Sequence, residues 1–210
     1  MSRPRLYPPF EHEYDVRSFV RGLLGGGKGG VFIDIGANVG VWSIDLAPLF
    51  DRVYAFEPWP EYAEQLRMNL RDYGVDNVEV IEAAAWDFNG QVLIGIGRRD
   101  DNKVLPGAPG LDVPAVGYPG VLARSVRGDD VIGEPFRLLK IDVEGTAMHV
   151  LRGMSRLLRE SRGVAVIEVH NHGESHGTYL YMLEHGWRLE RTLREFASGD
   201  LYHAHKVYVK

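Results

Sequence analysis

Residues 31–40 read Val-Phe-Ile-Asp-Ile-Gly-Ala-Asn-Val-Gly and constrain the fold more than any other segment of the sequence. The first five residues form the apolar run typical of a buried parallel strand, interrupted only by Asp34. Gly36 and Gly40 permit positive φ and close approach of the backbone, and apolar residues at helical spacing follow. A strand, a glycine turn and a helix in this order predict a βαβ unit whose bare main chain binds a nucleoside-bearing cofactor.

A carboxylate stands where such a unit binds ribose. The second predicted strand, residues 52–56, ends in Glu57-Pro58, and Glu57 follows Gly36 by 21 residues. An acidic side chain at this strand end accepts hydrogen bonds from the two ribose hydroxyls. Glu57 is therefore our candidate ribose ligand.

The spacing of the glycines separates two classes of cofactor. A dinucleotide fingerprint requires three glycines, as G-x-G-x-x-G, so that a pyrophosphate can lie on the helix N-terminus. Here position 38 is Asn, and no glycine closely follows Gly40. S-adenosylmethionine has no phosphate, so the pattern favours it over a nicotinamide dinucleotide. The alternative is a tight strand-to-helix corner without a ligand, against which Asp34, Asn38 and Glu57 argue together.

Composition is that of a compact enzyme. The 210 residues, 45% hydrophobic and 25% charged, suit one α/β domain over residues 31–210, preceded by a helix and a glycine linker over residues 1–30. The absence of cysteine excludes disulfides, thiolate zinc sites and cysteine nucleophiles. A net charge of −5 makes a nucleic-acid partner unexpected. No N-terminal apolar stretch suggests a signal peptide or a membrane span, so we expect a cytoplasmic protein.

Hydrophobic periodicity predicts alternating strands and helices along the rest of the chain. Residues 98–120 are predicted to be a loop and interpreted as a substrate lid, because eight of the fifteen residues 106–120 are Pro or Gly. Residues 197–200 form a turn short enough only for an antiparallel hairpin. The predicted helices cover residues 11–24, 41–50, 60–73, 147–158 and 174–184, and the predicted strands cover residues 31–35, 52–56, 78–82, 91–97, 121–126, 136–141, 164–169, 187–193 and 202–209.

This alternation, closed by an antiparallel hairpin, predicts a doubly wound α/β sheet in three α/β/α layers. The expected sheet has seven strands in the order 3-2-1-4-5-7-6, with the last strand antiparallel, as in class I methyltransferases.

Three motifs carry a family resemblance: residues 32–40, Phe56-Glu57-Pro58, and residues 139–145, which read Leu-Lys-Ile-Asp-Val-Glu-Gly. Through them the chain resembles the FkbM-type family of S-adenosylmethionine-dependent methyltransferases over roughly residues 30 to 170. The resemblance implies O-methyl transfer to a hydroxyl of a small molecule such as a sugar or natural product. One departure is Ala147, where the family usually continues Glu-Gly-x-Glu. The expected cofactor-binding residues are Asp34, Gly36, Ala37, Asn38, Gly40, Glu57, Pro58, Glu82, Ala84 and Asp142.

The acceptor hydroxyl must be aligned with the activated methyl group and must lose its proton. Asp142 and Glu144 end the fourth strand of the expected sheet, and Glu168 and His170 follow the fifth, all at the edge where open α/β sheets bind ligands. We take these four as catalytic candidates. His170 is the first choice for general base, because imidazole titrates near pH 7. A purely structural role for His170, as a hydrogen-bonding residue of the loop, stays open.

Other interpretations remain open at this point. Asp142, Glu144, Glu168 and His170 could instead hold a divalent ion, although without a tight spacing motif we assign no metal ligand. His203 and His205 lie two residues apart on the last strand and are expected to be solvated or packed. The alternatives for function are an RNA methyltransferase and a non-catalytic cofactor-binding protein. We expect a monomer or homodimer without a membrane partner.

Overall fold

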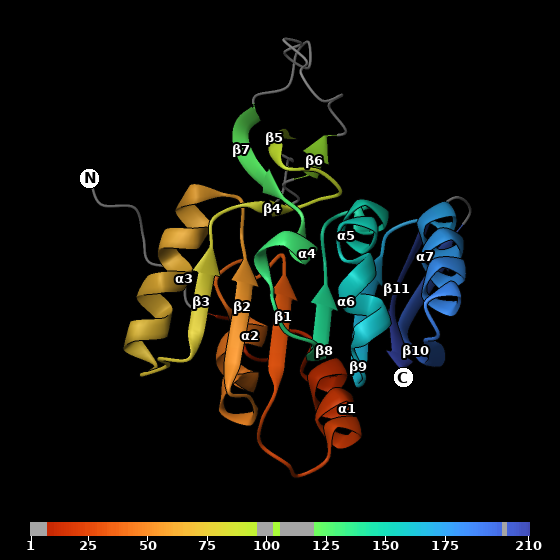
Figure 1. The fold of residues 1–210 in the computed structure, drawn as a ribbon, viewed down its shortest axis with the longest axis horizontal. Coiled ribbons are helices and arrows are strands. Elements are labelled where there is room, and N and C mark those ends of the chain that lie inside the picture. The colour runs from red at the N-terminus through yellow and green to blue at the C-terminus, as the bar shows by residue number, and fades with distance from the viewer. Residues whose placement is uncertain (1–7, 96–102, 106–119, 199–200) are drawn as a thin grey trace.

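The computed structural model describes residues 8–95, 103–105, 120–198 and 201–210, and its main element is a seven-stranded sheet (Figure 1). The strand order is β10-β11-β9-β8-β1-β2-β3. Numbered within this sheet, the order is 3-2-1-4-5-7-6, as predicted. β11 runs antiparallel to both of its neighbours, and the other neighbouring pairs are parallel. The strands are β1 (Val31–Ile35), β2 (Arg52–Phe56), β3 (Val78–Ile81), β8 (Phe136–Ile141), β9 (Val164–Val169), β10 (Arg188–Ser198) and β11 (Leu201–Val209).

Helices cover both faces of this sheet because side chains alternate along its buried strands. Phe32 of β1 packs with Val16 and Trp42 of the helices on one face, whereas Ile33 packs with Leu151 on the other. The predicted three layers are therefore present. The first face carries α1 (Tyr14–Leu24), α2 (Val41–Leu46), the short 3₁₀ helix η1 (Ala47–Leu49) and α3 (Pro60–Asp72), and the second carries α4 (Gly128–Val131), α5 (Ala147–Gly153), α6 (Ser155–Glu160) and α7 (His172–Glu184).

The helix predicted over residues 147–158 is in fact two helices. α5 ends at Gly153, where an added Cβ would lie 1.9 Å from the carbonyl oxygen of Trp86. α6 then begins afresh, because the Asp129 carboxylate accepts hydrogen bonds from the backbone N–H groups of Arg156, at 2.8 Å, and Leu157, at 3.0 Å. The side chain of Asp129 in α4 thus caps the start of α6, whereas hydrophobic periodicity alone predicts one continuous helix.

Other helix boundaries also differ from prediction. The helix predicted over residues 41–50 ends at Leu46, and the 3₁₀ helix η1 follows it. α1 starts three residues later than expected, after Glu13, whose φ of 56° is not helical. α7 starts two residues earlier, because Asn171 caps it by accepting a hydrogen bond from the N–H of Glu174 at 2.8 Å.

A second, four-stranded sheet was not predicted as such. Its order is β4-β7-β5-β6, with β5 and β7 antiparallel, and it stands over the carboxyl ends of β1 and β2 in Figure 1. Residues 103–105, predicted to be loop, form a strand of this sheet. The remainder of the predicted lid, apart from Gly120, lies outside the described residues. The strands are β4 (Ala84–Ala85), β5 (Gly90–Gly95), β6 (Lys103–Leu105) and β7 (Gly120–Val126).

The arrangement leaves the carboxyl ends of the parallel strands facing the second sheet. In open α/β sheets this edge binds ligands. Among the described residues, none of the helices has both the length and the apolar character needed to cross a membrane.

Candidate active site

The turn after β1 is built so that only glycine fits its first position. Gly36 has a φ of 76°, and an added Cβ would lie 1.9 Å from the carbonyl oxygen of Asp142 at the end of β8. Gly40 has a φ of 101°, and a Cβ there would lie 2.5 Å from Leu66 Cδ1. Asn38 also adopts a positive φ, 51°. The turn therefore packs main chain against main chain, as the sequence predicts for the cradle of a cofactor.

Glu57 connects this turn to the end of β2. Its Oε2 accepts a hydrogen bond from the N–H of Asn38 at 2.8 Å, and its Oε1 accepts one from the N–H of Trp59 at 2.9 Å. The side chain is buried, and burial raises the pKa of Glu57 to about 7. Each carboxylate oxygen has a further lone pair, so the group can also accept hydrogen bonds from hydroxyl groups of a ligand.

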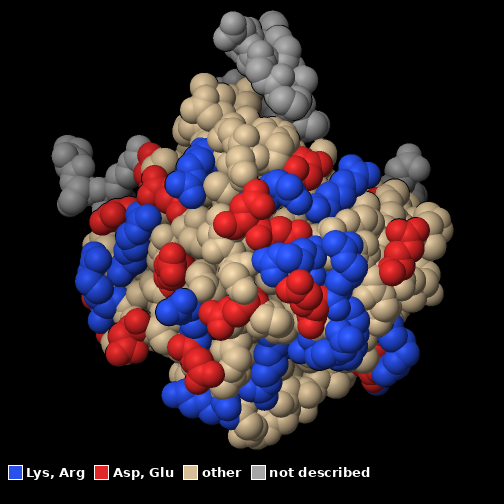
Figure 2. Space-filling view, in the orientation of Figure 1, with Lys and Arg blue, Asp and Glu red and all other residues tan. Residues whose placement is uncertain are grey.

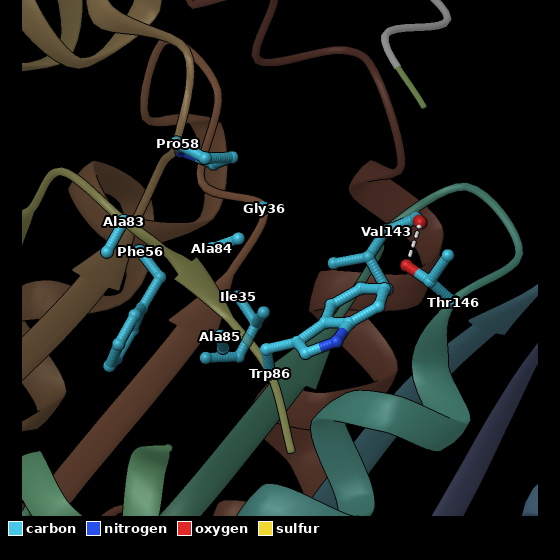
Figure 3. A pocket seen from close by; sticks show the side chains of 10 residues that line it. All are labelled: Ile35, Gly36, Phe56, Pro58, Ala83, Ala84, Ala85, Trp86, Val143 and Thr146. Atoms are coloured by element: carbon cyan, nitrogen blue, oxygen red, sulfur yellow. Dashed lines mark hydrogen bonds between the residues drawn. The ribbon is translucent and has the colours of Figure 1, made fainter. Parts of the chain in front are cut away.

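A cleft opens beside the glycine turn (Figure 3). Its walls are mainly apolar, and the hydroxyl of Thr146 is turned away to donate to the carbonyl oxygen of Val143 at 2.8 Å. Three of the predicted cofactor residues, Gly36, Pro58 and Ala84, line it, and the apolar walls suit a flat ring such as adenine. The lining consists of Ile35, Gly36, Phe56, Pro58, Ala83, Ala84, Ala85, Trp86, Val143 and Thr146.

Asp34 is fully buried, so its carboxylate does not reach the cleft. It accepts a hydrogen bond from Ser43 Oγ at 2.6 Å, and its Oδ1 lies 3.6 Å from Lys140 Nζ. Burial raises the pKa of Asp34. Lys140 in turn donates to the carbonyl oxygen of Gly36 at 2.9 Å and lies 3.3 Å from Asp142 Oδ2. Asp34 therefore contacts the turn through Lys140. The sequence predicts a direct contact between Asp34 and the cofactor, but no atom of its side chain is exposed to make one.

Sequence reasoning missed Lys140. Burial lowers the pKa of Lys140, but the carboxylates of Asp142 and Asp34 outweigh burial and raise it overall. The available signal was a lysine within the apolar strand β8, the same kind of interruption that singled out Asp34 in β1.

The other predicted cofactor residues lie near the cleft without lining it. Ala37 is buried in the turn, and Glu82 follows β3. Glu82 is 42% exposed and pairs with Arg67, whose Nη1 lies 2.9 Å from Glu82 Oε2. Their contact with a cofactor stays a prediction.

The four catalytic candidates do come together. His170 Nε2 lies 3.5 Å from Glu144 Oε2 and 3.6 Å from Glu168 Oε1. Asp142, Glu144 and His170 place one potential ligand atom each within 4.8 Å of one another. Because Asp142 also contacts Gly36 through its backbone, this group adjoins the cleft.

Carboxylates dominate the electrostatics of His170. Burial lowers its pKa, but Glu174, Glu144 and Glu168 outweigh burial and raise it above the usual value. The backbone N–H of His170 donates to Glu174 Oε2 at 2.8 Å, which fixes the loop after β9. A partly exposed imidazole held in this way can accept or donate a proton at the sheet edge.

Sequence reasoning also missed contacts made by the last strand. His203 hydrogen-bonds Glu168 Oε1 through its Nε2, and His205 Nε2 lies 3.4 Å from Glu168 Oε2. His205 also hydrogen-bonds Glu13 Oε1 at 2.9 Å, and Glu13 Oε2 accepts from Trp42 Nε1 at 2.7 Å. The signal was the spacing of His203 and His205, but only the register of β11, in which His205 pairs with Glu168, shows what they face.

Comparison with known proteins gives one family and a set of similar folds. A model of the methyltransferase FkbM domain matches residues 34–189. Over 72 residues the chain is 36% identical to the probable cobalt-precorrin-6B C(15)-methyltransferase (decarboxylating) of Methanothermobacter thermautotrophicus. That match covers 34% of this chain and 38% of the relative's length.

Two solved structures show the same fold. Methyltransferase FkbM of Methylobacillus flagellatus has a TM-score of 0.59 and 18% identity, and the match covers 88% of this chain and 45% of that one. A protein of Streptococcus mutans, solved with S-adenosylhomocysteine, has a TM-score of 0.56 and 14% identity, with 100% and 99% of the two chains covered.

Proposed function

This chain belongs to the FkbM methyltransferase family, and from that membership we propose that it transfers a methyl group from S-adenosylmethionine to a hydroxyl of a small molecule. One observation carries the proposal: the buried carboxylate of Glu57 is fixed by the N–H of Asn38 beside the bare backbone of Gly36. A carboxylate that can accept hydrogen bonds from hydroxyl groups therefore lies beside a turn that tolerates no side chain at its first position. This arrangement suits a ribose bound next to the main chain.

The residues present fit this cofactor. Glu57 would accept hydrogen bonds from the ribose hydroxyls, and the apolar walls around Ala84 would cover the adenine. The backbone at Gly36 and Asp142 would face the methionine portion. The bound cofactor supplies a methyl group that its sulfonium already activates. The protein has to hold the acceptor in line and exclude water.

The acceptor is expected at the cluster of Asp142, Glu144, Glu168 and His170. Removal of the hydroxyl proton needs a base within hydrogen-bond reach of the methyl acceptor. The side chain of His170 is 16% exposed and can therefore be reached. Carboxylates lie on two sides of its ring, Glu144 and Glu168 near Nε2 and Glu174 near Nδ1. In its neutral form His170 would accept the hydroxyl proton as the oxygen attacks the methyl carbon.

Calorimetric titration with S-adenosylhomocysteine, with NADH as the contrasting ligand, tests the cofactor site. We expect micromolar binding of the first and none of the second. Glu57→Ala removes a buried acceptor and should weaken binding by about 10–100-fold, the equivalent of a lost charged hydrogen bond. Glu64→Ala, on the exposed side of α3, is the matched control and should bind like the wild type. Absence of S-adenosylhomocysteine binding in the folded wild type would overturn the proposal.

The acceptor class is tested separately, with a radiolabelled methyl donor and panels of hydroxylated small molecules and structured RNA. On the face shown in Figure 2, basic and acidic side chains are interspersed rather than segregated. Arg156, from the arginine-rich helix α6, pairs with Glu160 at 2.7 Å. Together with the net charge of −5, this mixed surface supports a small-molecule acceptor over RNA. Label transfer to RNA alone, or cofactor binding without any turnover, would overturn the proposed acceptor.

A further inference from the structure

Three imidazole rings meet the carboxylate of Glu168 at the carboxyl end of β9. The Nε2 atoms of His170, His203 and His205 all face it, from the loop after β9 and from β11. An ordinary ion pair requires one histidine, so this convergence calls for a further explanation.

The two oxygens of Glu168 face different partners. Oε2 lies 3.4 Å from Nε2 of His205, which is 2% exposed and whose Nε2 also lies 2.9 Å from Glu13 Oε1. Oε1 faces His203 and His170, whose side chains are 40% and 16% exposed. His205 and Glu13 thus hold the carboxylate from the buried side, and the two accessible histidines meet its outward oxygen.

The spacing of these atoms is close to that of a metal site. Ligand atoms of a tetrahedral ion with bonds of about 2.0–2.1 Å stand about 3.3 Å apart. One ligand atom each from Glu168, His170 and His203 lies within 4.8 Å of the other two, and His170 Nε2 stands 3.6 Å from Glu168 Oε1. Small side-chain rotations would therefore complete the coordination.

A carboxylate also lies near the second ring nitrogen of His170. A histidine that binds a metal through one nitrogen usually directs the other toward a carboxylate or carbonyl. Nδ1 of His170 lies 3.8 Å from Glu174 Oε2, a carboxylate that also fixes the loop backbone.

We propose that Glu168, His170 and His203 bind one divalent transition-metal ion beside the cofactor cleft. Two imidazole nitrogens and one carboxylate oxygen suit ions such as Zn²⁺ or Fe²⁺ better than Mg²⁺ or Ca²⁺, which prefer oxygen ligands. Three protein ligands leave a position open, as in catalytic rather than structural sites.

The ion would have a place in the reaction, a step that rests on the proposed function. Glu144 and Asp142 join His170 to the glycine turn, so the open position would lie on the acceptor side of the cleft. A hydroxyl bound to a divalent ion loses its proton more readily. His170 would then be a metal ligand and not a free general base, and the hydroxyl proton would pass to the carboxylate of Glu144, which lies 3.5 Å from His170 Nε2.

Metal binding is tested without turnover. The protein, stripped with a chelator, is titrated calorimetrically with zinc chloride and, in a second series, with magnesium chloride, and its visible absorption is followed as cobalt chloride is added. We expect one zinc ion per chain, no comparable magnesium binding and a cobalt spectrum typical of nitrogen and oxygen ligation. His203→Ala should weaken zinc binding by more than about tenfold.

The controls separate a built site from adventitious histidine binding. His176→Ala removes an exposed histidine of α7 outside the cluster and should leave zinc affinity unchanged. His203 is half-exposed, so its removal should not unfold the protein, which circular dichroism checks. Equal zinc affinity in wild type and His203→Ala, or an equal loss in His176→Ala, would overturn the proposal. Zinc binding that depends on His203 would support it even if S-adenosylhomocysteine failed to bind.

Discussion

The carboxylate of Glu174 accepts a hydrogen bond from the backbone N–H of Ala147 at 2.9 Å, and so joins α7 to the first residue of α5. Its other oxygen accepts from the N–H of His170 at 2.8 Å. Ala147 stands where the family motif carries a second glutamate. A carboxylate therefore lies at the backbone of this position even though the residue itself is alanine, and it ties the ends of β8 and β9 together.

Glu174→Gln tests this connection. A carboxylate accepts from both N–H groups, whereas an amide has one acceptor oxygen and would turn its NH₂ toward the other donor. Leaving one buried N–H unpaired should lower the free energy of unfolding by about 1–3 kcal/mol, measured by urea denaturation. Glu184→Gln, at the exposed end of the same helix, is the control. Equal stability of the two variants would show that the connection contributes nothing.

Gly36→Ala tests the close approach of the glycine turn to β8. The added methyl group would overlap the carbonyl oxygen of Asp142, and the positive φ adds backbone strain. We expect a loss of about 2–4 kcal/mol in the free energy of unfolding. Gly22→Ala in α1, where no atom lies within 4 Å of the new Cβ, should instead gain about 0.5–1 kcal/mol. A Gly36→Ala protein as stable as the wild type would contradict this close packing of Gly36 against Asp142.

The order of the main sheet could be predicted because each step depended on local pattern. The buried runs of β1, β8 and β9 and the short hairpin turn fix which strands are central and which strand reverses. Two strands of the second sheet, β5 and β7, were predicted, but the sheet was not, since β4 has only two residues and β6 has three and adjoins a segment rich in proline and glycine. Such strands exist through pairing, of β4 with β7 and of β6 with β5, and not through their own periodicity.

The residues of the candidate site also fall into those that local pattern predicts and those that it does not. Residues of the glycine turn and the strand ends were found because motif and strand end coincide. Lys140, Glu13 and His203 were missed as participants because their importance comes from contacts between distant segments, such as the 192 residues that separate Glu13 from His205. Local pattern does not encode the register of β11 on β9.

The affinity for S-adenosylhomocysteine should rise with pH through the titration of Glu57. Burial raises the pKa of this carboxyl to about 7, and hydroxyl donors on a ligand favour its ionised form. Below that pH the ligand must displace a proton, so affinity should fall by up to about tenfold per pH unit and level off above about pH 8. Calorimetry across this range measures the profile.

Glu57→Gln serves as the control for that profile, because its amide does not titrate. Its binding should be weaker and should lack the wild-type rise, so the difference between the two curves isolates Glu57 from ionisations of the ligand. A wild-type curve parallel to that of Glu57→Gln would mean that the carboxylate does not meet the ligand.

Lys140→Met tests the cation beneath the glycine turn, and its effect should depend on pH. Without Lys140 the buried Asp34 and the adjacent Asp142 lose their counter-charge, which should cost about 3–5 kcal/mol of unfolding free energy near neutral pH. Burial raises the pKa of Asp142 to about 7 and also raises the pKa of Asp34, and losing the cation raises both further. Protonation at lower pH removes the buried charge, so the deficit should shrink between about pH 8 and about pH 5.

Lys206→Met separates this electrostatic effect from the loss of any buried lysine. Lys206 is likewise buried, but its Nζ donates to the carbonyl oxygen of Ser175 at 2.8 Å. Its removal should therefore lower the free energy of unfolding by the same amount at about pH 8 and at about pH 5. If the deficit of Lys140→Met were also constant with pH, Lys140 would support the turn only through its hydrogen bond to the Gly36 carbonyl, and the charge of Asp34 would have no part in shaping the cofactor site.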